Sequence, residues 1–510
     1  MYGRVAGVTV VGVGGHRVAV EAFVGRGLPS LTLTGLPGAA AQDARDRIRP
    51  AVEHAGLEWP LRRVVVNLAP ANLRKEGPGL DAAISVAVLA ATAQVPARAL
   101  DGVVFFGEVS LRGEFVPTPG VLSAAIAAAR DGARVIVVPE GNAAEAALVD
   151  ALRVVAAPGL QQAVGFLRGT WEAPDVVVSA PAWRPPAVDF ADVRGQHQAR
   201  RALEIAAAGG HNLLLVGSPG AGKTMLARRL PSILPPLTRA EALEATQLHS
   251  VAGLLTGRGL LSERPFRSPH HTVSTAGLLG GGSTVVRPGE VSLAHHGVLF
   301  LDEVTEFRRD AIESLRQPLE DGHVVVTRVG GSVAFPARCT LVAAANPCPC
   351  GFHEDPARDC RCRDDQIARY RAKLSGPLLD RIDLRLSVPR LTKHELLGAE
   401  PAESSTDVRA RVVQARGRQL SRLEGTGWSC NAHLPGPAAR RLASLTAEAE
   451  RQIGSAVEAS ALSGRGFDRV VKVARTIADL EAVVEIEERH VLEALAYREA
   501  FTETSQRRAS

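Results

Sequence analysis

The sequence predicts a multidomain α/β fold, and three observations lead to this prediction. The chain has 510 residues, which at roughly 100–200 residues per domain allows about three domains. Short Val- and Ile-rich runs, such as residues 103–109 and 135–139, alternate with Ala-rich helical stretches in the first third of the chain. A second region with the same alternation follows a Pro-rich joint.

The same features divide the chain into four segments. Residues 1–175 are expected to form the first α/β domain, and residues 176–190 a linker. Residues 191–390 are expected to form the second α/β domain, which contains most of the recognisable motifs. Residues 391–510 have a helical and charged pattern, so we predict a helical domain there.

The composition is that of an ordinary globular protein. Hydrophobic residues make up 46% and charged residues 22% of the chain, which excludes wholesale disorder, collagen and coiled coils. No apolar run reaches the roughly 18 residues of a membrane span, and the N-terminus lacks the pattern of a signal peptide. We therefore expect a cytoplasmic protein with no membrane segment. The net charge of +5 is compatible with nucleic-acid binding but does not by itself favour it.

A phosphate-binding loop is predicted directly after the apolar run that ends at Val216. The motif G-x-x-x-x-G-K-T lies between this strand pattern and a helical stretch. Its glycines allow backbone N–H groups to converge on phosphate oxygens. Lys223 would reach the β- and γ-phosphates, and the Thr224 hydroxyl would bind Mg²⁺. The residues predicted to bind ATP or GTP are Gly217, Ser218, Pro219, Gly220, Ala221, Gly222, Lys223 and Thr224.

Polar side chains end two further strand patterns. Asp302 and Glu303 follow the apolar run 297–301, and Asn346 follows the apolar run 340–345. Asp302 would hold Mg²⁺, and Glu303 would polarise the attacking water. A buried strand with an acidic edge is the alternative, but the upstream phosphate loop favours the catalytic role. Adjacent Asp and Glu favour AAA+ ATP hydrolysis over a GTPase switch, and Asn346 would then orient the water as sensor 1.

Residues 324–335 predict a β-hairpin just before the strand that ends at Asn346. Two Val-rich halves flank Gly330 and Gly331, which suit a two-residue turn. A hairpin in this position marks one branch of AAA+ proteins. It therefore adds a structural feature to the catalytic ones.

Further motifs occur in one order along the chain. They are Arg264–His271, Gly280–Gly282, Arg287–His295, Leu315–Glu320 and Asn346–Gly351. Together with the phosphate loop they resemble the magnesium-chelatase-like AAA+ family, and within it the ComM/YifB type. The resemblance covers nearly the whole chain, and it implies a homo-hexameric ring that uses ATP and Mg²⁺.

The resemblance also implies two arginine roles. Residues 378–383 are similar to the family segment that supplies an arginine finger, so Arg381 should reach the γ-phosphate bound by a neighbouring subunit. Residues 463–475 resemble the sensor-2 helix of the lid, and Arg465 aligns with its arginine. The alternative for Arg465 is an ordinary surface arginine on an amphipathic helix.

Two loops should face the central pore of such a ring. The Gly-rich residues 276–290 correspond to the family's helix-2 insert, and the hairpin 324–335 accompanies it. Arg287 and Arg328 are therefore candidates for contacts with phosphates in the pore. Each could equally be a solvated loop charge.

The cysteines are strongly clustered. Of the six, all except Cys430 lie between residues 339 and 362, which argues against a disulfide framework. Four thiols could close a tetrahedral Zn²⁺ site, although the spacing within each pair is tighter than is usual. Reduced, partly buried loop thiols are the alternative. The four candidates are Cys348, Cys350, Cys360 and Cys362.

The N-terminal segment resembles the proteolytic domain of Lon-type proteases, a ribosomal-S5-type α/β fold. Residues 76–81 lie where such a protease has its nucleophile motif, and residues 106–113 match the hairpin that follows. Gly79 occupies the serine position, and the stretch after Gly120 has no lysine where the catalytic one should lie. Acyl transfer requires a nucleophile and a base, so we predict the fold without protease activity.

Two functions stay open. One is a ring ATPase that remodels or translocates DNA, as implied by the ComM-like resemblance to a branch-migration helicase of natural transformation. The other is a magnesium-chelatase-type motor that acts on a protein partner in tetrapyrrole metalation. The N-terminal domain argues against the second, because chelatase motor subunits typically begin at the AAA+ module. Gly79 argues against an ATP-dependent protease.

Overall fold

The structure is a computed structural model. It describes residues 1–75, 77–176, 188–255, 259–282, 285–328, 331–374, 376–392, 395, 402–459 and 462–498. Most of the predicted linker, Glu76 of the protease-like motif and Gly330 of the predicted turn lie outside the described residues.

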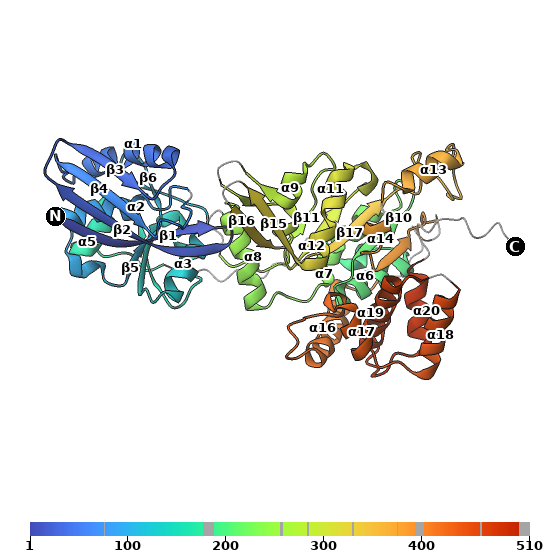
Figure 1. Ribbon diagram of the computed structural model, residues 1–510. Helices are drawn as coiled ribbons and strands as arrows, with labels where there is room; N and C mark the ends of the chain where they lie inside the picture. The colour runs from blue at the N-terminus through green and yellow to red at the C-terminus, as the bar shows by residue number, and fades with distance from the viewer. Residues whose placement is uncertain are drawn as a thin grey trace.

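The N-terminal part of the chain folds around a seven-stranded mixed sheet at one end of the molecule (Figure 1). The strand order is β3-β4-β2-β1-β5-β8-β9. The strands are β1 (Tyr2–Val11), β2 (Gly14–Gly25), β3 (Ser30–Thr34), β4 (Arg63–Ala69), β5 (Val103–Phe105), β8 (Val135–Pro139) and β9 (Arg153–Ala157). Strands β1 and β2 are antiparallel, whereas β5, β8 and β9 add to β1 in parallel.

Helices cover this sheet, and a short hairpin lies beside it. The helices are α1 (Gly38–His54), α2 (Asp81–Ala91), α3 (Val121–Arg130), α4 (Ala143–Ala146) and α5 (Leu160–Arg168), and the hairpin is β6 (Glu108–Val109) with β7 (Phe115–Val116). Helix α2 is buried almost all round, because it packs between α1, α5 and the strands. The Ala-rich sequence permits this close approach to the sheet.

The second sheet has five parallel strands in the order β11-β14-β17-β10-β18. They are β11 (Phe266–Arg267), β14 (Val298–Leu301), β17 (Thr340–Ala345), β10 (Leu213–Val216) and β18 (Leu384–Ser387). Every residue of β10 and β14 is buried, as expected where apolar cores cover both faces of a parallel sheet. Because all five strands are parallel, their carboxyl ends meet at one edge of the sheet and their amino ends at the opposite edge.

The helices of this second domain fall on both faces and in the connections. They are α6 (His197–Gly209), α7 (Lys223–Ile233), α8 (Arg239–Val251), α9 (Thr275–Leu279), α10 (Glu290–Leu293), α11 (Arg309–Ser314), α12 (Arg316–Asp321), α13 (Asp364–Arg371) and α14 (Gly376–Leu379). Two short antiparallel pairs are inserted among them: β12 (Gly280–Gly281) with β13 (Arg287–Pro288), and β15 (His323–Arg328) with β16 (Gly331–Pro336).

The hairpin predicted at residues 324–335 is therefore present, but the predicted position of its turn is wrong. Arg328 pairs with Gly331, so Gly331 belongs to the second strand. Residues 329–330, which join the two strands, lie outside the described residues. Two flexible glycines in sequence do not by themselves fix the register, which depends here on the burial of Val324, Val326 and Phe335 against the core.

The C-terminal part is helical, and Figure 1 shows it packed below the parallel sheet. It comprises α16 (Ser405–Arg422), α17 (Gly436–Leu442), α18 (Ala447–Glu458), α19 (Gly464–Leu480) and α20 (Glu488–Ala496). Ser463 caps α19 by accepting a hydrogen bond from the N–H of Gly466. The apolar face predicted for this helix is confirmed, since Val470, Val473, Ala474 and Ile477 are all buried.

The N-terminal domain contacts the second domain through the turn between β1 and β2 (Figure 1). The Gln247 amide, on α8, donates hydrogen bonds to the Val13 carbonyl at 2.6 Å and to the Ser123 hydroxyl at 3.1 Å. Val13, and Val333 of the β15–β16 hairpin, both pack against the apolar core of the second domain. Helix α3 also packs against α8, so the two domains share a partly polar interface.

A buried ion pair joins α19 to the parallel sheet. Asp383 forms a salt bridge with Arg469 and contacts His211 at 3.2 Å. Burial would raise the pKa of Asp383, but the Arg469 guanidinium and His211 outweigh burial and hold the pKa below its usual range.

We expect Asp383→Asn to destabilise the protein by about 3 kcal/mol at neutral pH, because Arg469 would lose its buried counter-charge. Asp150→Asn, which breaks an exposed pair with Arg239, should cost at most about 1 kcal/mol. Since the pKa of Asp383 is lowered on folding, its stabilising effect is lost as pH falls below about 4. Urea unfolding at neutral and acidic pH tests this, and a wild-type-like Asp383→Asn midpoint at neutral pH would contradict it.

Candidate active site

The predicted phosphate loop lies between β10 and α7, at the carboxyl edge of the parallel sheet. Strand β10 ends at Val216, and α7 begins at Lys223. Gly220 and Gly222 have φ values of 81° and 94°, a left-handed conformation that favours glycine. Ligands of parallel α/β sheets bind at this edge, where the helix N-terminus also favours anions.

Lys223 lies inside the loop rather than on the surface. Its side-chain ammonium donates hydrogen bonds to the Gly217 carbonyl at 2.5 Å, the Ser218 carbonyl at 3.1 Å and the Asn346 Oδ1 atom at 3.1 Å. Burial lowers the pKa of Lys223, and the nearby Asp302 and Glu303 carboxylates oppose that shift. The ammonium is thus held where phosphate oxygens would replace the carbonyls.

The oxygen atoms expected to hold Mg²⁺ lie together. The Thr224 hydroxyl donates a hydrogen bond to Asp302 at 2.7 Å. Mg²⁺ in phosphoryl-transfer enzymes is held by one or two such oxygen ligands together with phosphates and waters. These donors therefore fit the ion that the motif predicts, and when bound it would neutralise charge on the phosphates.

Glu303 follows β14 and takes an unusual backbone conformation. Its φ is 49°, which is uncommon for a residue with a side chain. Its N–H donates to the Asp302 carboxylate at 3.0 Å, and its own side chain is exposed. Residues held in such conformations cluster at functional sites. The geometry fits different roles for the two carboxylates. Asp302 is turned toward Thr224, as a Mg²⁺ ligand would be, whereas Glu303 is open to water.

The structure brings most of the predicted hydrolytic residues to one place. Lys223, Thr224, Asp302, Glu303 and Asn346 all lie at the carboxyl edge, on three neighbouring strands. Sequence reasoning missed Arg390 there, whose guanidinium donates to the Pro219 carbonyl at 3.3 Å. The sequence could have indicated Arg390 only through its position shortly after the apolar run of β18, the strand beside β10.

Arg381 and Arg465 are not at this edge. Arg381 precedes β18, and its carbonyl accepts a hydrogen bond from Asn212, which precedes β10. Arg381 and Asn212 therefore lie at the amino edge of the sheet. At about 3.3 Å per residue, the four residues of β10 separate the edges by about 13 Å. Arg381 is thus remote from the phosphate loop of its own subunit.

The amino edge carries a cleft of about 540 Å³ between the sheet and the helical domain. Arg381, Arg465 and Arg469 line it, with Glu320 and Asp383 among the carboxylates. Arg381 is paired with Glu320 of α12, and its side chain is 15% exposed. Arg465 is exposed and has no ion-pair partner in the part of the chain that the structure describes. The sequence motif Leu315–Glu320 contains Glu320 but does not indicate this pairing.

Comparison with known proteins agrees with this arrangement. The family described as "Subunit ChlI of Mg-chelatase" matches residues 20–142, "Magnesium chelatase, subunit ChlI" matches residues 189–396, and "Magnesium chelatase, subunit ChlI C-terminal" matches residues 402–498. The chain is 41% identical over 490 residues to YifB of Escherichia coli, which covers 96% of this chain and 95% of YifB. It is 40% identical over 497 residues to competence protein ComM of Haemophilus influenzae, which covers 96% of each.

The chain belongs to the magnesium-chelatase-like ComM/YifB family. An uncharacterised relative from Mycobacterium tuberculosis is 46% identical over 479 residues, or 94% of this chain and 95% of the relative. The family is one of AAA+ ATPases, which supports ATP hydrolysis by this chain. None of the described helices is long and apolar enough to cross a membrane.

The two arginines predicted for the pore lie on neighbouring inserts of this AAA+ ATPase. Arg287 is on β13 and Arg328 ends β15, and both side chains are exposed. A side chain at Gly281 would place its Cβ 3.1 Å from the Arg328 guanidinium, so the β15–β16 hairpin and the β12–β13 pair touch. The two candidate residues thus belong to one surface of the molecule.

The protease-like segment of this family member has no room for a nucleophile at Gly79. A Cβ at this position would lie 2.6 Å from the ring of Phe106. Phe106 is buried in the smaller of the two hydrophobic cores of the N-terminal domain. Over 147 residues, 28% of this chain, the sequence is 31% identical to Lon protease 1 of Hydrogenovibrio crunogenus and covers 18% of it. The glycine is therefore a packing requirement as well as the loss of a serine.

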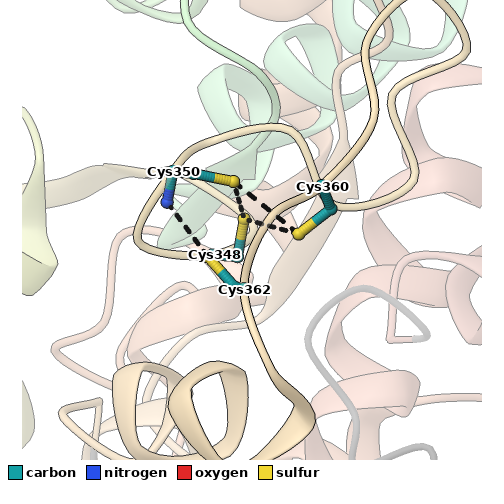
Figure 2. Close-up of side chains that lie close together, drawn as sticks. All are labelled: Cys348, Cys350, Cys360 and Cys362. Atoms are coloured by element: carbon teal, nitrogen blue, oxygen red, sulfur yellow. Dashed lines mark hydrogen bonds between the residues drawn. The ribbon is translucent and has the colours of Figure 1, made fainter.

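The four clustered cysteines come together in one loop (Figure 2). The loop begins at Asn346, so it is continuous with the candidate active site. No cysteine of the chain forms a disulfide.

Proposed function

We propose that the protein hydrolyses ATP as a homo-hexameric ring and uses the energy to translocate or remodel DNA in the cytoplasm. One observation carries the ring. The phosphate loop lies at the carboxyl edge of the parallel sheet, whereas Arg381 and Arg465 lie at the amino edge. A single subunit therefore cannot complete its own site, but a head-to-tail neighbour can.

Within this site the chain's residues divide the work. The backbone N–H groups of the phosphate loop and Lys223 bind the phosphates, and Thr224 and Asp302 hold Mg²⁺. Glu303 accepts a proton from the attacking water, and Asn346 orients that water. ATP and Mg²⁺ are the cofactors that this function requires.

The neighbouring subunit completes the site with its amino edge. Arg381 would exchange its pairing with Glu320 for the γ-phosphate bound next door, and Arg465 would approach the same nucleotide. An arginine supplied in this way stabilises the charge that develops on the transferred phosphoryl group.

DNA is proposed as the moved object on two grounds. Arg287 and Arg328 lie exposed on adjoining inserts, and such side chains contact phosphates without regard to sequence. The relative ComM is named a competence protein, which fits a role in recombination of imported DNA. The alternative is a motor acting on a protein partner in tetrapyrrole metalation, which the family descriptions favour.

The proposal predicts that single-stranded or forked DNA raises the ATPase rate of the purified ring. Arg328→Ala and Arg287→Ala should weaken this stimulation and leave basal hydrolysis unchanged. Each lost phosphate contact should also reduce the slope of log K against log salt concentration by about 1. Arg309→Ala, a change at an exposed arginine paired with Glu313 on α11, serves as the control and should behave as wild type.

Two results would contradict this prediction. DNA could bind no better than a neutral polymer, or neither pore variant could alter the stimulation. The chelatase-type function, with a protein as the moved object, would then replace it.

A further inference from the structure

The cysteine loop, residues 346–363, links β17 to α13 and contains no helix or strand. Connections of this length without secondary structure are uncommon in compact domains and are usually functional. We propose that Cys348, Cys350, Cys360 and Cys362 bind one Zn²⁺ and that the metal-closed loop positions the phosphate loop and Asn346. The positioning role rests on the proposed function, whereas the metal site does not.

The sulfur positions fit a single metal ion. Cys348 Sγ lies 3.4 Å from Cys350 Sγ and 3.7 Å from Cys360 Sγ, and Cys350 Sγ lies 3.6 Å from Cys360 Sγ. The four sulfurs all lie within 4.8 Å of one another. A tetrahedral site with Zn–S distances of about 2.3 Å requires separations of about 3.8 Å. An iron–sulfur cluster is larger than one ion and would hold the sulfurs further apart.

Backbone amides surround these sulfurs, as they do in zinc–thiolate sites. The N–H of Cys350 donates to Cys362 Sγ at 3.4 Å, and the N–H of His353 donates to Cys348 Sγ at 3.3 Å. Such donors stabilise the negative charge of metal-bound thiolates and fix the ligand orientation. Binding of Zn²⁺ would release the thiol protons to solvent.

Simple packing does not explain the cluster. Cys348 is buried, but Cys350, Cys360 and Cys362 are only partly buried. These three do not belong to any of the hydrophobic cores formed by the described residues. Two short Cys-x-Cys turns, separated by residues 351–359, converge here (Figure 2), and a metal supplies the free energy that would hold such a loop together.

The cysteine loop also packs against the ATP site. Gly351 lies so close to the phosphate loop that a Cβ there would be 2.7 Å from Pro219 Cδ. The Asp355 carboxylate lies beside the Ser218 side chain and the Arg390 guanidinium, both of which lower its pKa. The loop begins at Asn346, which accepts the hydrogen bond from Lys223. One end of the loop is therefore part of the site, and its middle covers the phosphate loop.

At the other end of the loop, hydrogen bonds join α13 and the residues after it to the turn that contains Glu303. In α13, the Tyr370 hydroxyl accepts a hydrogen bond from Thr305 at 2.6 Å, and the Arg371 guanidinium donates to the Pro347 carbonyl at 3.4 Å. Lys373 donates to the Thr305 carbonyl at 3.1 Å. Closing the loop with a metal would thus fix three parts of the ATP site relative to one another.

The metal is tested first by elemental analysis of the full chain purified without a metal-affinity tag. We expect about one zinc per chain in the wild type and in Cys339→Ser, whose thiol lies outside the loop, and less than about 0.2 in Cys360→Ser or Cys362→Ser. In the folded wild type, a mercurial reagent should release zinc in step with modification of the four loop thiols. Less than about 0.2 zinc per wild-type chain with freely reactive thiols, or iron in place of zinc, overturns the metal site.

The positioning role is tested on the wild type, so that it does not depend on how well the variants fold. Removal of zinc with a chelator should slow ATP hydrolysis by about 10–100-fold, as expected for displaced catalytic groups, and added Zn²⁺ should restore the rate. ATP binding and hydrolysis that are unchanged in zinc-free protein refute the positioning role. Glu303→Gln should keep full zinc content, so a failure of the ATPase assignment and a failure of the zinc site give different results.

Discussion

Glu303→Gln is expected to bind ATP as the wild type does and to hydrolyse it at least about 100-fold more slowly. Glu303 is exposed beside the oxygens proposed to bind Mg²⁺, and among the described residues its side chain forms no hydrogen bond with the phosphate loop. The amide keeps the size of the side chain but cannot accept a proton from water, so only the chemical step is affected. A fluorescent ATP analogue measures binding, and phosphate release measures turnover.

Glu306→Gln is the matched control for this experiment. Glu306 lies one turn further along the same connection and is also exposed, but it faces Lys373 rather than the site. Its variant should hydrolyse ATP at close to the wild-type rate. Near-wild-type hydrolysis by Glu303→Gln would show that Glu303 does not accept the proton from the attacking water.

Arg381→Ala is expected to lower hydrolysis by about 10³-fold, the usual effect of removing an arginine finger. ATP binding to the same subunit should persist, because Arg381 lies at the amino edge of the sheet and the phosphate loop at the carboxyl edge. Its loss also leaves Glu320 without its partner, so Glu320→Gln is needed as a second variant. If Arg381 acts on the neighbour, Glu320→Gln should retain activity.

A parallel fall in ATP affinity and rate in Arg381→Ala would contradict this role. It would indicate that Arg381 shapes the site of its own subunit through the sheet. Gel filtration of each variant is required as well, because a failure to assemble would also abolish hydrolysis without any direct role in catalysis.

That the candidate hydrolytic residues lie together was predictable, because each lies in or directly beside a short local pattern. Lys223 and Thr224 begin a helix shortly after a strand, and Asp302 and Glu303 directly follow a second buried strand. The grouping then follows from one further fact, namely that parallel strands bring their carboxyl ends together. The structure adds the geometry, such as the left-handed conformation of Glu303.

The positions of Arg381 and Arg465 could not be derived from the sequence in the same way. Arg381 lies at the amino edge because it comes just before β18, a strand that was not predicted. The place of Arg465 depends on how the helical domain packs, and this rests on long-range contacts such as Asp383 with Arg469. The pairing of Arg381 with Glu320 joins residues that are 61 positions apart. Hydrophobic periodicity in the sequence cannot indicate such a long-range contact.

The N-terminal domain shows a third case. The absence of a serine at Gly79 was visible in the sequence, but its physical reason was not. Phe106 fills the space that any side chain at position 79 would need. A Gly79→Ser change would therefore meet a clash as well as the missing base.

A mixture of Lys223→Ala and Arg381→Ala subunits tests the central claim most directly, namely that each ATP site is built from two copies of the chain. Each variant alone should be inactive. In a random equimolar ring about one interface in four combines an intact Lys223 with a donated Arg381, so roughly a quarter of the wild-type rate should return on mixing. Co-assembly, shown by retention of one subunit on a tag carried by the other, with no recovery of hydrolysis would contradict a site shared between subunits.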